Sequence, residues 1–182
     1  MSPLKPLTLH IQHTWDGAPL GPDEAAVAHV TCAAGWVEFE VSAPYHGDPP
    51  PSAPSGLMDG LWAFEVVEVF LCGPGERYLE VEFGPHGHYL ALALEGIRGR
   101  ASRELLPLEY EATVDGARWQ GRARLMLPAG GLGFLPGGVA RVNAFAIHGA
   151  GAARRYLAAW PTGGARPDFH RLEAFASLAE AG

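Results

Sequence analysis

The run Trp62-Ala-Phe-Glu-Val-Val-Glu-Val-Phe-Leu-Cys72, the break Gly73-Pro-Gly75 and the run Tyr78-Leu-Glu-Val-Glu-Phe83 decide the fold of this chain. Glutamates alternate with large apolar residues in both runs, which is the period-two pattern of a β-strand with two different faces. With Leu71 opposite Leu79, the runs form a hairpin with its loop at 73–77. One face of this hairpin is then entirely apolar: Val67, Val69, Leu71, Leu79, Val81 and Phe83.

The opposite face of the hairpin carries the acidic residues. It comprises Val66, Glu68, Phe70, Tyr78, Glu80 and Glu82. A tight turn at Gly84-Pro-His-Gly87 predicts a third strand in the same sheet. This turn places His88, Leu90, Leu92 and Leu94 in the core and Tyr89, Ala91 and Ala93 beside the glutamates. The sequence therefore predicts an acidic, aromatic sheet face on which small residues leave room for a polar ligand with apolar patches.

Length and composition narrow the class of protein. A chain of 182 residues suits one domain over residues 1–182. Its net charge of −7 argues against nucleic acid and anionic membrane surfaces as partners. No run approaches the ~20 apolar residues of a membrane span, so we expect a soluble, cytoplasmic protein. The two cysteines, Cys32 and Cys72, indicate neither a disulfide scaffold nor a thiolate zinc site.

Strand-like periodicity recurs along the whole chain and predicts an all-β fold. We expect a distorted antiparallel β-sandwich, jelly-roll-like, of about ten strands with a short C-terminal helix that Asp168 would cap. Residues 45–60 and 128–138 are predicted as long loops, the first of which should border the acidic face. Beyond the three runs above, the expected strands are 7–14, 25–32, 36–43, 108–114, 118–127, 139–148 and 154–160.

Glu68, Glu80 and Glu82 are the strongest candidates for chemistry, because neighbouring carboxylates repel one another unless something positive or rich in hydrogen-bond donors compensates them. The partner could be the hydroxyls of a ligand or a bound calcium ion. Alternatively, the fold itself could supply an arginine, or the strands could face water. The arginines considered are Arg77, Arg141, Arg154 and Arg155.

Paired glutamates also match glycoside hydrolases, in which two carboxyl groups about 5 to 9.5 Å apart flank the scissile bond. Many acidic sheets satisfy that geometry, so catalysis is not expected. No nucleophile elbow, phosphate-binding loop or zinc motif is present in the sequence. The histidines, His170 among them, are expected to lie in turns and to bond to backbone.

Aromatic residues near loops could stack on a sugar ring. Trp62 and Trp160 each adjoin a loop rich in proline or glycine, and Tyr156 shares a strand face with Trp160. These three are the aromatic candidates for a binding surface.

The landmarks together resemble an uncharacterised protein family with the fold of family 9 carbohydrate-binding modules, a β-sandwich related to DOMON domains. This resemblance implies binding of a sugar between aromatic rings and charged side chains. It places Trp62, Glu65, Glu68, Glu80 and Glu82 at or under the binding surface. The stretches that carry it are His13–Gly17, Leu61–Phe70, Tyr78–Glu82, Pro85–Gly87, Leu106–Leu108, Trp119–Gly121, Asn143–Gly149 and Pro167–His170.

The sequence as a whole predicts a domain that binds a small saccharide or a glycosylated metabolite, without a cofactor unless calcium is bound. Two alternatives stay open at this point: a hydrolase that acts on glycosides through the paired glutamates, and an interaction module without a small ligand. The predicted ligand-binding residues are Trp62, Glu65, Glu68, Glu80, Glu82, Tyr89, Tyr156 and Trp160.

Overall fold

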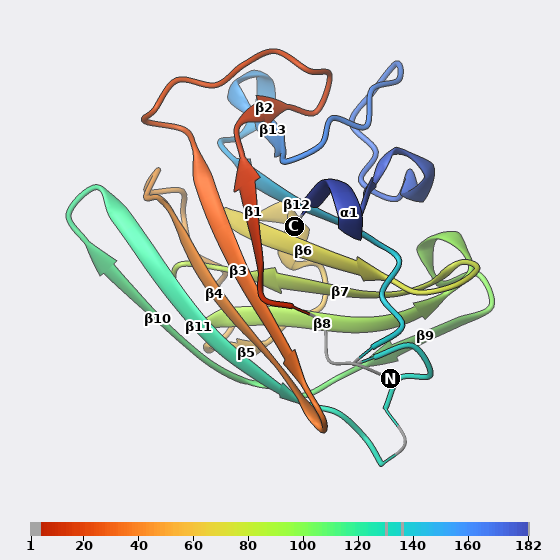
Figure 1. The fold of residues 1–182 in the computed structure, drawn as a ribbon. Helices are drawn as coiled ribbons and strands as arrows, with labels where there is room; N and C mark the ends of the chain where they lie inside the picture. The colour runs from red at the N-terminus through yellow and green to blue at the C-terminus, as the bar shows by residue number, and fades with distance from the viewer. Residues whose placement is uncertain (1–4, 130, 136, 182) are drawn as a thin grey trace.

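Two β-sheets lie face to face in the computed structural model, which describes residues 5–129, 131–135 and 137–181 (Figure 1). The five-stranded sheet has the order β1 (Leu7–Ile11), β3 (Ala26–Ala33), β4 (Trp36–Pro44), β11 (Arg118–Met126) and β10 (Glu109–Asp115). The larger sheet has the order β2 (His13–Thr14), β13 (Arg155–Ala158), β12 (Arg141–His148), β6 (Val66–Cys72), β7 (Arg77–Phe83), β8 (His88–Glu95) and β5 (Gly56–Leu57), while β14 (Ala176–Ser177) pairs with β12 and β9 (Ser102–Leu105) with β8.

The predicted all-β class is confirmed, with antiparallel pairing between all described strands except β5 and β8. The described residues form fourteen strands where about ten were expected, partly because β2, β5 and β14 are pairings of only two residues. Four 3-10 turns and one short helix complete the described chain: η1 (Leu61–Ala63), η2 (Ile97–Gly99), η3 (Gly151–Ala153), η4 (Leu172–Ala174) and α1 (Leu178–Ala181).

The C-terminal helix begins later than predicted. Phe175 adopts an extended conformation after η4, and Ala176 then pairs with Val142 of β12, so that α1 has only four residues. Asp168 caps no helix; its carboxylate accepts hydrogen bonds from the backbone N–H of His170 and from Arg98. No helix in the described part of the chain has the length and apolar character needed to cross a membrane.

The main core lies between the two sheets, where alternate residues of each strand point inward. The predicted hairpin register is confirmed, with Leu71 opposite Leu79 and Val67 opposite Phe83. The six apolar side chains predicted for the inner face of this hairpin are all buried in that core. Phe39 of β4 meets Phe83 across the interface, with ring centroids 5.4 Å apart.

The predicted phase of β8 is wrong by one residue. Gly84 donates its N–H to the carbonyl of His88, so that the loop contains three residues, and Phe83 pairs with Tyr89. A shift of one residue moves every side chain of a strand to the other face. Leu90, Leu92 and Leu94 therefore lie on the glutamate face, and Tyr89, Ala91 and Ala93 face the core between the sheets.

A second apolar layer covers part of the outer face of the larger sheet. Phe169 stacks on Phe145 of β12 at 4.0 Å between ring centroids, and Phe175 meets Phe70 of β6 edge to face at 5.6 Å. All seven residues of β6 are buried as a result. The C-terminal segment thus buries part of the outer face as well, and an opening remains over part of β6, β7 and β8.

We predict that Gly87→Ala lowers the free energy of unfolding by about 1–2 kcal/mol, because Gly87 holds a left-handed φ of +81° in the β7–β8 loop. Urea denaturation measures the change. Gly21→Ala is the matched control, since Gly21 has no positive φ and a Cβ there would meet nothing within 4 Å. Equal losses in the two variants would contradict the role assigned to this loop.

Candidate functional site

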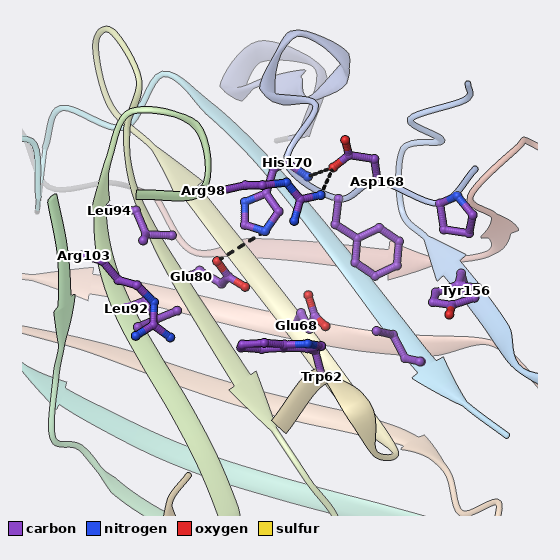
Figure 2. A pocket seen from close by; sticks show the side chains of 13 residues that line it. Trp62, Glu68, Glu80, Leu92, Leu94, Arg98, Arg103, Tyr156, Asp168 and His170 are labelled. Atoms are coloured by element: carbon purple, nitrogen blue, oxygen red, sulfur yellow. Dashed lines mark hydrogen bonds and ion pairs between the residues drawn. The ribbon is translucent and has the colours of Figure 1, made fainter. Parts of the chain in front are cut away.

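A cavity of about 300 Å³ opens on the outer face of the larger sheet. Its floor is formed by side chains of β6, β7 and β8, and the segment 167–170 forms one wall (Figure 2). Trp62 of η1 stands at another side with 46% of its surface exposed. The cavity therefore lies where the second apolar layer leaves the glutamate face uncovered.

Glu68, Glu80 and Glu82 form a glutamate cluster at this floor. Glu68 and Glu82 lie opposite each other on β6 and β7, and Glu80 follows on the same face of β7. One carboxylate oxygen from each lies within 4.8 Å of the others, and the residues are only 2%, 4% and 0% exposed, respectively. Glu68 and Glu80 line the cavity, whereas Glu82 is not among its lining residues.

Four oxygen atoms of the glutamate cluster have no hydrogen-bond donor among the described residues. They are Glu68 Oε1, Glu80 Oε2 and both carboxyl oxygens of Glu82. A buried charge without a partner is costly, so these groups must hold protons or meet a positive or donor-rich partner.

Burial raises the pKa of every member of the cluster. Burial raises the pKa of Glu80 to about 7. Burial first, and then repulsion from neighbouring carboxylates, raises the pKa of Glu68 and Glu82 well above the usual range. At neutral pH the metal-free cluster therefore retains protons.

None of the four arginines considered as internal partners forms an ion pair with the cluster among the described residues. Arg155 pairs instead with Glu24 at 3.0 Å. Arg154 donates to the carbonyl oxygens of Trp62 at 2.5 Å, Ala63 at 3.0 Å and Gly149 at 3.1 Å. Arg154 is thus a positioning residue that holds the η1 turn, and with it Trp62, at the edge of the cavity.

A hydrogen-bonded chain runs along the opposite side of the cavity. The Tyr78 hydroxyl accepts from the backbone N–H of Arg98 at 2.9 Å and lies 2.7 Å from Nδ1 of His170. With the hydroxyl proton directed at Nδ1, a neutral His170 carries its own proton on Nε2, which lies 4.0 Å from Oε2 of Glu80 (Figure 2). Burial lowers the pKa of His170 to about 4, so the ring is neutral at pH 7.

Two arginines line the cavity, and each is paired with an aspartate rather than with the glutamates. Arg98 lies 2.7 Å from Asp168, and Arg103 lies 2.5 Å from Asp59. Arg98 also has a φ of +59°, a left-handed conformation that costs energy for a residue with a Cβ. The cavity thus combines acidic groups at its floor with hydrogen-bond donors on its walls.

The structure brings together five of the eight predicted ligand-binding residues. Trp62, Glu68, Glu80 and Tyr156 line the cavity, and Glu82 adjoins two of them. The Arg154 guanidinium lies 5.6 Å from the centre of the Tyr156 ring.

The other three predicted residues lie elsewhere. Glu65 is buried and accepts hydrogen bonds from the backbone N–H groups of His46 at 2.9 Å and Asp48 at 3.2 Å, so it anchors the start of the loop 45–60. Tyr89 faces the core between the sheets because of the β8 phase. Trp160 packs against that same core.

Sequence reasoning missed several residues of the cavity. Leu92 and Leu94 were assigned to the wrong face, and His170 was expected to be a turn histidine bonded to backbone. The segment 167–170 approaches the sheet only through tertiary packing, so no local pattern placed it there. Nothing in the sequence indicates the left-handed φ of Arg98. The other lining residues missed are Arg103, Ile147, Pro167, Asp168 and Phe169.

We predict that the free energy of unfolding of chelator-treated protein falls as the pH rises from 6.5 to 8. The glutamate cluster keeps protons in the folded state that the unfolded chain releases above pH 4.5, so stability is lost as the pH rises through the raised pKa values. His148 and His170, with pKa values lowered to about 4, act in the opposite direction only below pH 6.5.

Each proton retained on folding contributes a slope of about 1.4 kcal/mol per pH unit. Glu82→Gln should therefore flatten the profile obtained by urea denaturation between pH 6.5 and 8. Glu104→Gln is the matched control, because Glu104 is an exposed residue of β9. A wild-type profile that rises over this range would show that the cluster is ionised in the folded protein.

The chain is similar to known proteins both in its fold and in its sequence. No family model matches it. A solved structure from Bacteroides uniformis, described as a "putative carbohydrate-binding protein", shares the fold with a TM-score of 0.67 over 96% of this chain and 85% of that one, at 14% identity.

Vertebrate proteins match this chain at the level of sequence. The UPF0462 protein C4orf33 homologs of Mus musculus and Danio rerio are 40% and 38% identical over 91% and 93% of this chain, covering 87% of each relative. The Homo sapiens UPF0462 protein C4orf33 is 38% identical over 92% of this chain and 85% of its own length. The chain therefore belongs to the UPF0462 family.

Proposed function

We propose that this protein binds a small saccharide or a glycosylated metabolite in the cavity over Glu68 and Glu80. One observation carries the proposal: two buried carboxyl groups with unpartnered oxygens open into a cavity of about 300 Å³ beside the half-exposed ring of Trp62. Such groups are costly to bury unpartnered, and a ligand with hydrogen-bond donors would offset that cost.

The chemistry of the walls suits a hydroxylated ring. Sugar hydroxyls donate to carboxylate oxygens, and they accept from the guanidinium groups of Arg98 and Arg103. The Nε2–H of His170 adds a further donor near Glu80. Trp62 offers a flat apolar surface for the C–H face of a sugar, so polar and apolar parts of one small molecule would both be satisfied.

The volume favours a small ligand over a polymer. Ligand cavities span about 300–1,000 Å³, and this one lies at the lower end of that range. The solved structure from Bacteroides uniformis supports a carbohydrate as the ligand class because it is described as a "putative carbohydrate-binding protein". At 14% identity, the likeness itself shows a shared fold and not a shared ligand.

Hydrolysis of a glycoside is the second candidate function. The observation that favours it is the difference between two adjacent carboxyl groups: the pKa of Glu80 lies at about 7, whereas burial holds the pKa of Glu68 well above its usual range. A protonated Glu68 could act as the acid and an ionised Glu80 as the base or nucleophile. An interaction module without a ligand is less favoured, because the cavity is open rather than filled by the protein's own loops.

Trp62→Ala should weaken saccharide binding about tenfold, equivalent to about 1.4 kcal/mol, because the exposed ring supplies the stacking surface. A panel of monosaccharides and disaccharides is first screened by thermal shift, and the strongest binder is then titrated by calorimetry. Trp36→Ala is the matched control, since Trp36 lies on β4 in the other sheet with its ring 5.0 Å from the Arg124 guanidinium. Equal affinity in the wild type and Trp62→Ala would rule out this stacking role.

Glu68→Gln distinguishes binding from catalysis. If the protein only binds, the variant should weaken saccharide binding by about 1 kcal/mol or more, because one hydrogen-bonded carboxyl group is replaced. If the protein is a hydrolase, the same variant should abolish turnover of an aryl glycoside while largely sparing affinity. Calorimetry and release of the aryl group from the wild type and the variant separate the two outcomes.

A further inference from the structure

We propose that the glutamate cluster of Glu68, Glu80 and Glu82 binds one oxygen-preferring divalent cation, of the Ca²⁺ or Mn²⁺ class, at the floor of the cavity. This site goes beyond saccharide binding, because its three protein ligands come together without any sugar. Its remaining coordination positions would face the cavity.

The position of Glu82 separates a small ion from an organic ligand. Glu82 is 0% exposed, both of its carboxyl oxygens lack a hydrogen-bond partner, and it is absent from the cavity lining. A sugar or an organic amine in the cavity would meet Glu68 and Glu80 without reaching Glu82. A single ion among the three carboxyl groups contacts all of them, and so satisfies the one member that no larger ligand can reach.

Within the described part of the chain, no guanidinium group forms an ion pair with the cluster. The nearby guanidinium groups of Arg98, Arg103 and Arg154 are committed to Asp168, to Asp59 and to backbone carbonyls. Their charges lower the pKa of Glu80 and Glu68 but do not offset the effect of burial, which keeps both pKa values raised. A divalent cation would neutralise the carboxylates where the protein's own cations do not.

The spacing of the oxygens fits one ion. Two oxygens bound to the same Ca²⁺ at ~2.4 Å can be at most about 4.8 Å apart, and one oxygen from each glutamate lies within that separation of the others. Mg²⁺ demands near-octahedral geometry and usually keeps several of its waters, so a site of three buried carboxyl groups suits Ca²⁺ or Mn²⁺ better.

The test uses full-length protein treated with chelator and then dialysed. Ca²⁺, Mn²⁺, Mg²⁺ and Zn²⁺ are titrated separately by calorimetry and by thermal shift, without any sugar. We expect one Ca²⁺ or Mn²⁺ per chain and a rise in Tm of about 5–10 °C at about 100 times the Kd. Repetition in buffers of different ionisation enthalpy should show that protons are released as the ion binds.

Glu82→Gln should lower the affinity for the preferred ion at least tenfold, whereas Glu104→Gln should bind this ion with wild-type affinity. If Glu82→Gln does not fold, Glu80→Gln provides the same comparison. The proposal fails if no ion binds at millimolar concentration, which would mean that protons alone neutralise the cluster. It also fails if folded Glu82→Gln retains wild-type affinity, or if only Zn²⁺ binds.

Saccharide titrations with excess chelator and with saturating Ca²⁺ keep this proposal separate from the proposed function. Sugar binding in chelator, combined with no response to any ion, would overturn the cation site and leave the saccharide proposal standing. Ion binding with no response to the saccharide panel would support the cation site and overturn the saccharide proposal.

Discussion

The pairing of β6 with β7 places three carboxyl groups on one buried face, and the rest of the cavity is arranged around that constraint. Because the inner face of this hairpin must be apolar to join the main core, period-two geometry sends Glu68, Glu80 and Glu82 together to the outer face. The C-terminal segment then covers part of that face with Phe169 and Phe175 and borders the cavity that remains. Carboxyl groups that would be solvated on a bare sheet become desolvated, and their pKa values rise.

The segments around the cluster act as positioning elements rather than as counter-charges. Arg154 holds the turn that carries Trp62, and Tyr78 orients the ring of His170 toward Glu80. Arg98 and Arg103 are directed to aspartates near the cavity. These three arginines therefore donate no hydrogen bond to the glutamate cluster, and the carboxyl oxygens of the cluster remain available to a ligand. A cavity built in this way is more consistent with binding than with a purely structural sheet face.

The two proposed ligands, a saccharide and a divalent cation, require different contacts with the glutamate cluster. A saccharide needs acceptor oxygens and a flat apolar wall, which Glu68, Glu80 and Trp62 provide at the cavity surface. A divalent cation needs several carboxylate oxygens around one point, and this includes the buried Glu82. The two can coexist, since an ion held by three protein ligands keeps open positions that water or sugar hydroxyls can occupy.

Alternation of residue types was enough to predict the all-β class, the β6–β7 register and the shared face of Glu68, Glu80 and Glu82, because side-chain direction in a strand depends only on parity. The phase of β8 was not predictable in the same way, since a loop with one more residue than expected reverses every side chain after it. Only tertiary packing decided that the segment 167–170 closes over the sheet and that the arginines bond elsewhere. Those contacts join residues far apart in the chain, and no local pattern encodes them.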